Sequence, residues 1–156
     1  MDKIAFLAAL DAERAKWDTG LAGLDETQML EPTGVADWSV KDLIAHVVWF
    51  ERQMVRLLQR RTLNGESPLW EKTPEERNKS IYEENRERPL ELVLTEARAV
   101  YSQMREQLGD LTDEELTDPR RFNMPEDWVP WQIIAENTYQ HYQDHRAALK
   151  RKIPKR

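Results

Sequence analysis

Apolar residues recur at mostly three- and four-residue spacing along most of the chain, with polar residues between them. This period lines apolar side chains along one side of a helix, and no segment alternates cleanly with the two-residue period of a strand. The pattern predicts four long helices, over about residues 2–24, 39–61, 89–108 and 129–152. Four long helices in one chain predict an all-α fold, a four-helix bundle.

The first two helices carry local start signals. Asp2 can cap the first helix, and Ser39 with Asp42 forms a near capping box, with Asp in place of the preferred Glu. The second helix should end near residues 61–64, where Asn64-Gly65 is a stop signal. The stripe expected to face the core along the first helix comprises Ile4, Leu7, Leu10, Trp17, Leu21 and Leu24.

The connections between the long helices have uneven lengths. Residues 26–30 should form a single helical turn, and Thr112 should start another. In the long second connection, Thr73-Pro74 is a strong helix start and predicts a short extra helix to about Arg86. An up-down-down-up bundle would need such a crossover connection, although spacing alone leaves the helix order in space open.

Length and composition limit the class of protein. The 156 residues predict a single domain spanning 1–156. Because the chain has no Cys, disulfides and thiolate ligands are excluded, and any metal site must use nitrogen or oxygen donors.

The formal net charge of -6 argues against nucleic acid as the main partner. The exception to the acidic balance is a basic cluster at residues 150–156, interpreted first as a complement to a helix C-terminus. The N-terminal apolar run is too short for a signal peptide, and no stretch reaches the length of a membrane span. A cytoplasmic protein with no membrane partner is expected.

The three histidines are the residues that indicate chemistry. His141 and His145 lie four positions apart, which on a helix places them on one face about 5–6 Å apart. A helical His-x-x-x-His pair is by itself weak evidence, because most such pairs are surface or ordinary core histidines. Here both fall on the expected inward stripe, where a bundle would normally have Leu, together with Trp131, Ile134, Thr138 and Ala148.

His46 borders the apolar stripe of the second helix, between Leu43 and Phe50. Three inward imidazoles from two helices could bind one metal and leave coordination positions open, which is typical of a catalytic rather than a structural site. Such a site can activate water, or it can bind an external thiol, which must come from a cofactor because the chain has no Cys.

Two histidine segments resemble a known family. Residues 37–46, DWSVKDLIAH, resemble the second-helix signature of the DinB-like superfamily, and residues 137–145, NTYQHYQDH, resemble its fourth-helix signature. Residues 78–85, with Ile81 and Tyr82, look like the subgroup of ClbS/DfsB-type proteins. The resemblance spans nearly the whole chain.

This resemblance implies a four-helix bundle, often dimeric, that binds nickel, zinc or another divalent ion. The positions that match the superfamily's ligands are His46, His141 and His145. Known activities of the superfamily include thiol-cofactor-dependent S-transferases and isomerases, and ClbS-like relatives hydrolyse a strained electrophilic ring in a genotoxin.

Helper residues are less clearly indicated. Asp42 could orient the His46 ring, but completing the cap with Ser39 is the favoured interpretation. Asp144 is expected to be solvated. The candidate pocket residues, for several of which plain core packing remains the competing interpretation, are Trp49, Glu51, Gln53, Tyr82, Asn85, Trp128, Trp131 and Asn137.

Two classes of function follow. The first is a metal-dependent hydrolase or thiol-cofactor S-transferase that acts on a small electrophilic compound in detoxification or stress, as a homodimer. The alternative is a non-catalytic stress-response binding or dimerisation module with a structural metal or none.

Overall fold

The computed structural model describes residues 1–150, with side chains up to residue 149. Its regular elements over this range are helices, and Pro32 and Ser39 add one isolated β-bridge. The predicted end of the last helix near Lys152 lies outside the described residues. So do the side chains of the basic cluster, Lys150, Arg151, Lys152, Lys155 and Arg156.

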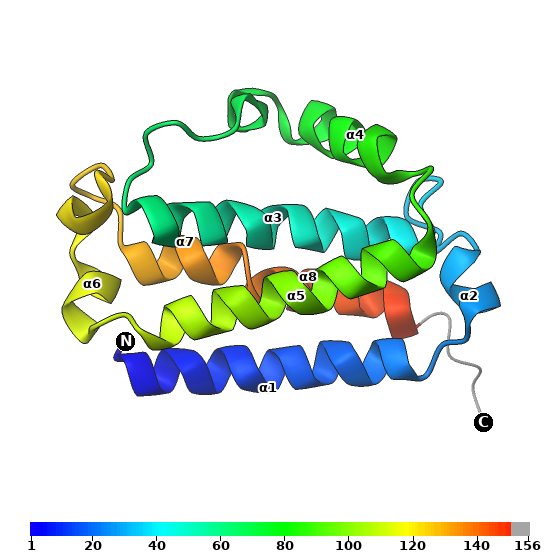
Figure 1. Cartoon of the computed structure of the whole chain (residues 1–156), viewed down its shortest axis with the longest axis horizontal. Coiled ribbons are helices and arrows are strands. Elements are labelled where there is room, and N and C mark those ends of the chain that lie inside the picture. The colour runs from blue at the N-terminus through cyan, green and yellow to red at the C-terminus, as the bar shows by residue number, and fades with distance from the viewer. Residues whose placement is uncertain (151–156) are drawn as a thin grey trace.

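The predicted four-helix bundle is confirmed (Figure 1). Its long helices are α1 (Lys3–Ala22), α3 (Val40–Arg60) and α5 (Leu90–Gly109), with α7 (Pro130–Glu136) and α8 (Tyr139–Lys150) together forming the fourth. Figure 1 shows α1 and α7–α8 running in one direction and α3 and α5 in the other, so the order is up-down-down-up. α3 is the central helix, with most of its residues buried.

Short helices lie in the connections. They are α2 (Glu26–Leu30), η1 (Pro68–Glu71), α4 (Pro74–Asn85), α6 (Asp113–Thr117) and η2 (Pro119–Phe122). α4 is the extra helix predicted in the long second connection, which crosses over so that α5 can run parallel to α3 (Figure 1). Among the helices of the described part, none combines the length and apolar character needed to cross a membrane.

The predicted helix starts are confirmed at the level of hydrogen bonds. The Asp2 carboxylate accepts from the Ala5 N–H, and the Thr73 hydroxyl accepts from the Glu76 N–H. Ser39 and Asp42 form a full capping box, because the Asp42 carboxylate also accepts from the Ser39 N–H at 2.9 Å. These side chains satisfy N–H groups that have no partner within the helix.

The predicted core face of α1 was wrong at its start. Ile4 is 80% exposed, whereas Phe6 is 1% exposed and packs edge-on against Tyr139 of α8, with ring centroids 5.6 Å apart. The buried face continues through Leu10, Glu13, Arg14 and Trp17. Two charged residues, Glu13 and Arg14, therefore lie on the buried face of α1. Because of them, the spacing of apolar residues alone did not identify which side of the first turn faces the core.

α3 ends at Arg60, next to the region where the sequence predicted its end, but the residue that stops it is not the expected Asn64-Gly65. Arg61 adopts a left-handed conformation with φ of 56°, and its N–H donates to the Leu57 carbonyl. The chain therefore leaves the helix at Arg61, a residue other than Gly in the left-handed position that usually favours Gly.

The fourth long helix is not continuous, contrary to the prediction. Between α7 and α8 the Asn137 side-chain amide donates to the Ile133 carbonyl at 2.8 Å, and the Thr138 hydroxyl donates to the Ile134 carbonyl at 2.7 Å. These side chains compete with the backbone for carbonyls one turn earlier. The backbone N–H groups of residues 137 and 138 bond only three residues back, so the helix is interrupted just before the segment with His141.

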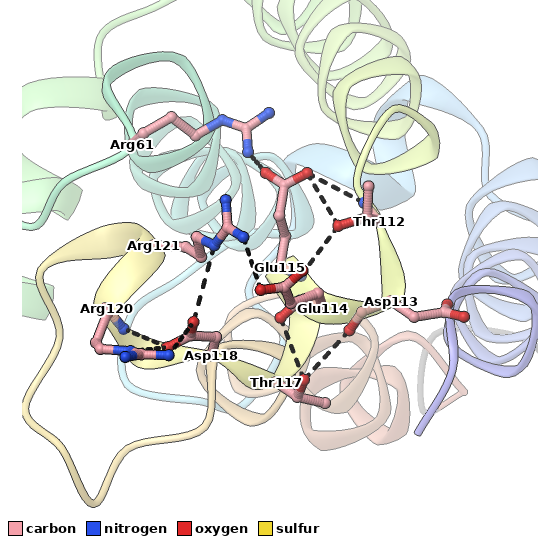
Figure 2. Close-up of polar contacts among 9 residues, drawn as sticks. All are labelled: Arg61, Thr112, Asp113, Glu114, Glu115, Thr117, Asp118, Arg120 and Arg121. Atoms are coloured by element: carbon pink, nitrogen blue, oxygen red, sulfur yellow. Dashed lines mark hydrogen bonds and ion pairs between the residues drawn. The ribbon is translucent and has the colours of Figure 1, made fainter.

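A cluster of ion pairs closes the end of the bundle near α6 and η2 (Figure 2). Arg61 at the end of α3 pairs with Glu115 of α6, and Arg121 of η2 pairs with Glu114 at 2.7 Å and with Asp118. Individual exposed pairs contribute little stability. The Arg61–Glu115 pair joins the connection between α5 and α7 to the end of α3, and the Arg121 pairs hold α6 and η2 together within that connection.

Candidate metal centre

The three histidines meet inside the bundle. His46 lies in the second turn of α3, and His141 and His145 lie one turn apart on α8. The Nε2 atom of His141 is 3.1 Å from that of His46 and 2.9 Å from that of His145. One potential ligand atom from each ring lies within 4.8 Å of the other two. Residues from two helices and three positions therefore converge on one point.

The cluster is largely removed from water. His46 is 3% exposed, His141 is also buried, and His145 is half-buried. Burial, with a smaller contribution from the neighbouring rings, lowers the pKa of His46 to about 2 and that of His141 to about 3. Burial also lowers the pKa of His145. The imidazoles are therefore neutral at physiological pH, which is the form that binds a metal ion.

Hydrogen bonds alone do not satisfy the three nitrogens. A neutral imidazole nitrogen either donates one proton or accepts with one in-plane lone pair. His141 Nε2 faces two other Nε2 atoms, so one in-plane group would have to serve two partners. A divalent ion would use a lone pair from each ring, and bonds of 2.0–2.1 Å place ligand nitrogens roughly 2.9–3.4 Å apart. The donor set and its spacing fit such an ion.

The Nδ1 atoms, on the other side of the imidazole rings, have fewer hydrogen-bond partners. The Nδ1 atoms of His46 and His141 are buried and have no hydrogen-bond partner within the described residues. Asp42, the expected candidate for orienting His46, instead accepts from the Ser39 N–H and hydroxyl, each at 2.9 Å. Its other carboxylate oxygen is buried and unpartnered. The capping interpretation of Asp42 is therefore the one that its contacts support.

Two aromatic rings enclose the cluster. The centroid of the Trp38 ring is 5.0 Å from that of His46, and Phe50 lies 4.9 Å from His46 and 4.6 Å from His141. Neither residue was among the pocket candidates. Phe50 could have been found because it lies one turn beyond His46 on α3, whereas Trp38 reaches the cluster from the loop that precedes the helix.

Two pocket candidates form a second row behind these rings. Tyr82 of α4 stacks on Trp38, with centroids 6.2 Å apart and planes within 4° of parallel. Trp49 packs against Phe50 at 4.9 Å and against Trp70 of η1 at 5.2 Å. Both therefore support the enclosing rings through aromatic contacts. The crossover segment with η1 and α4 thus takes part in the surroundings of the site.

Other candidates have different environments. Gln53 lines a small groove beneath residues 62–66 together with Trp70. The Asn85 amide donates to the Ile81 carbonyl, and its oxygen accepts from Arg88, so it closes the end of α4. Asn137 bonds to the α7 backbone, as described above.

Two tryptophan candidates also lie apart from the rings that enclose the cluster. Trp128 is 40% exposed and precedes α7, whose seven residues span about 10 Å before α8 begins. Trp131 is half-buried and packs against the hydrophobic core. Neither contributes an aromatic contact to the histidines comparable to those of Trp38 and Phe50.

A buried charged network joins α1, α3 and α8, and its member Tyr142 follows His141 in the chain. Glu51 of α3 is 0% exposed, and one carboxylate oxygen accepts from the Tyr142 hydroxyl at 2.6 Å and from Arg14 at 3.1 Å. Arg14 also donates to Asp18 at 3.0 Å. Burial raises the pKa of Glu51 despite the opposing attraction of Arg14. Arg14 was missed from the sequence, although a charged residue on the core face of α1 was the available signal.

Comparison with known proteins places this site in context. Residues 10–145 match the family described as the mycothiol maleylpyruvate isomerase N-terminal domain, and this range includes all three histidines. A crystal structure of an uncharacterised protein from Escherichia coli UTI89 is similar, with a TM-score of 0.75 and 19% sequence identity. The alignment covers 96% of this chain and 91% of that one, and at this identity it supports the fold alone.

A search of the curated proteins finds no relative that matches. The family match covers most of the chain, and both the match and the structural neighbour agree with the DinB-like bundle predicted from the two histidine segments. The chain therefore belongs to the mycothiol maleylpyruvate isomerase N-terminal domain family, within the DinB-like helical superfamily.

Proposed function

We propose that this protein is a metal-dependent enzyme that joins a low-molecular-weight thiol to a small electrophilic compound, as an S-transferase or a thiol-dependent isomerase. The observation that carries the proposal is the convergence of three neutral imidazoles on one point. His46, His141 and His145 would hold one divalent ion, and nickel and zinc are among the ions that an all-imidazole donor set suits. Three protein donors leave room for an exogenous ligand, as in catalytic sites.

A bound divalent ion would act as a Lewis acid and lower the pKa of a thiol or water molecule that it binds. Side chains of the protein hold the three imidazole rings in place. Packing on Trp38 and Phe50 limits rotation of the His46 ring, and Phe50 also contacts His141. The Glu51 network attaches α8 to α3 through Tyr142, the residue that follows His141. These contacts would hold the three nitrogens in position before an ion arrives.

Two observations support an external thiol as the nucleophile. The chain has no Cys, so the thiol has to come from solution. The matched family is described by a mycothiol-dependent isomerase, which supports a thiol cofactor of this class. If water were the nucleophile instead, the same centre would act as a hydrolase, and this outcome would be detected by turnover without any thiol.

The surroundings of the cluster favour a small substrate with apolar character. Trp38 and Phe50 form apolar walls, and the Trp38–Tyr82 stack extends one of them toward α4. His145 is the most exposed of the three ligands, which provides an approach from solvent. An aromatic enclosure excludes water and so favours attack by a sulfur nucleophile over competing hydrolysis.

Metal content tests the ligand set. Protein purified without a polyhistidine tag and dialysed against zinc or nickel should retain close to one ion per chain, as measured by inductively coupled plasma mass spectrometry. His46→Ala, His141→Ala and His145→Ala should each lose most of this occupancy. Tyr139→Phe, a change on the same helix, is the matched control and should retain it. Full occupancy in His141→Ala would contradict the proposed ligands.

Turnover tests the reaction. The metal-loaded protein would be incubated with maleylpyruvate or a chlorinated dinitroaromatic compound, with mycothiol, glutathione or no thiol, and followed by absorbance. The proposal expects turnover that requires both thiol and metal. A one-to-one metal site with no turnover for any thiol and with a closed coordination sphere would support the alternative, a non-catalytic module with a structural metal.

A further inference from the structure

A second cavity lies between α1, α3 and α5, apart from the histidines. Its volume is about 370 Å³, within the range of small-molecule sites. On α3 it is lined by Ile44, Val47, Val48 and Glu51. At 100° per residue these positions lie about 100–160° around the helix from His46, so the cavity opens on a different side of α3. It is therefore a separate site from the metal centre.

The cavity has the composition of a binding site. Most of its wall is apolar, and two aromatic side chains contribute to it, Trp17 of α1 and Tyr101 of α5. The polar groups are few: Arg14 and Glu51 are buried, whereas Asp18 and Arg98 lie at the exposed rim. An apolar enclosure with a few convergent polar groups is typical of sites that bind small organic molecules.

One polar atom in this site lacks a partner. Glu51 Oε2 accepts from Tyr142 and Arg14, but Glu51 Oε1 has no hydrogen-bond partner within the described residues and is shielded from bulk water. An unpaired buried oxygen of this kind costs free energy, which a bound partner would recover. Glu51 lines the cavity, but its Oε1 atom exposes almost no surface, so a molecule bound there becomes its partner when the lining side chains shift to admit a hydroxyl group.

The charges of the site select a neutral ligand. Arg14 and Glu51 already form an ion pair, and a third charge beside them would be desolvated without a counterion. A hydroxyl suits Oε1 in both states of Glu51, since it donates to a carboxylate and accepts from a carboxylic acid. Burial raises the pKa of Glu51, and a hydroxyl group can bond to it whichever form it takes.

We infer that this cavity binds a small neutral molecule with an apolar or aromatic body and one hydroxyl group that hydrogen-bonds to Glu51 Oε1. The body would lie among the apolar side chains, between Trp17 and Tyr101. This site is independent of the metal, and it would remain if the histidine cluster bound nothing.

The test uses phenol and cyclohexanol as probes and toluene as the matched probe without a hydroxyl. Binding to the full-length protein would be measured by isothermal titration calorimetry. We expect phenol or cyclohexanol to bind one-to-one, and toluene to bind at least about tenfold more weakly, as the loss of one buried hydrogen bond predicts.

Cavity-filling variants locate the site. Ala97 is buried in α5 and lines the cavity, so Ala97→Leu should reduce phenol affinity at least about tenfold while leaving the far-UV circular dichroism unchanged. Ala99→Leu, at an exposed position of the same helix, is the matched control and should bind as the wild type does. If Ala97→Leu does not fold, Leu94→Phe fills the same cavity.

Three results would overturn the inference. The first is the absence of binding by both hydroxyl probes at millimolar concentration. The second is unchanged phenol affinity in a folded cavity-filling variant, which would place the probe elsewhere, including at the metal. The third is equal affinity for toluene and phenol, which would remove Glu51 from the site.

Discussion

Replacing Arg14 with Met should destabilise the protein by an amount that grows with pH. Arg14 is the cation beside Glu51, which is fully buried in α3. Arg14→Met preserves the length and apolar part of the side chain but leaves Glu51 with only the Tyr142 hydroxyl as a donor. Removing one partner of a buried ion pair costs about 3–5 kcal/mol.

The pH dependence follows from the protonation of Glu51. Burial already raises its pKa above the ordinary value, and Arg14 opposes this shift. Without Arg14, the pKa of folded Glu51 rises further, so the folded variant holds a proton that the unfolded chain releases above about pH 4.5. A group with a raised folded pKa contributes stability that is lost as pH increases through that pKa. The destabilisation relative to wild type should therefore grow as pH rises, by at most about 1.36 kcal/mol per pH unit, which sets a ceiling of about 2.7 kcal/mol between pH 5.5 and 7.5.

The assay is urea unfolding followed by far-UV circular dichroism at both pH values, with chelator present so that metal does not contribute. The control is the double variant Arg14→Met with Glu51→Gln, in which Gln keeps an acceptor for Tyr142 but carries no charge. Residue 51 no longer titrates in this variant, so its stability should change less between pH 5.5 and 7.5 than that of Arg14→Met. The reasoning is refuted if the Arg14→Met destabilisation shrinks as pH rises, or if the double variant shows the same pH dependence as the single one.

Three further predictions address the metal centre and the fold. Without metal, the free energy of unfolding should fall as pH decreases below 6.5, because histidines in the unfolded chain bind protons that buried His46 and His141, with their lowered pKa values, do not. At pH 5 the loss should be about 2 kcal/mol for each ring. Urea titrations at pH 7.5, 6.5 and 5 measure it. Zinc at about 100 times its dissociation constant should stabilise the wild type by about 2.7 kcal/mol at pH 7.5, and thermal unfolding should show no such gain for His141→Ala. Ser39→Ala should cost about 1 kcal/mol through loss of the capping box at the start of α3, and a cost near zero in urea unfolding would mean that the cap is dispensable.

Local signals predicted most of the elements because helix starts depend on a few neighbouring residues. Ser39, Thr73 and Thr112 each cap a helix where the sequence placed one, since the side chain and the N–H that it bonds lie three residues apart. The position of the α3 end was also predicted, but the residue that stops the helix was not, because Arg61 takes a left-handed conformation that propensity assigns to Gly or Asn. The break between α7 and α8 was missed because Asn137 and Thr138 are also tolerated inside helices, where their side chains bond to the backbone in the same way.

The candidate site also combines features that local sequence predicts with features that only helix packing sets. The spacing of His141 and His145 on one helix is a local property and was readable directly from the sequence. Which side chains surround them is a property of the packing between helices. Trp38 comes from a loop, whereas Asn85, which looked equally suitable, bonds to the α4 backbone, and Trp128 is 40% exposed. The periodicity of apolar residues does not distinguish the side chains that contact the histidines from those that do not.

The helical class, the helix starts and the pairing of two histidines on one face were determined by the sequence, because each depends on residues within one or two turns. The tertiary structure decided that His46 meets that pair, that Phe6 rather than Ile4 faces the core, and that Arg14, Glu51 and Tyr142 share one buried network. The reason is physical: these contacts join residues between 37 and 133 positions apart, and their distances are set by how four helices pack rather than by the spacing within any of them.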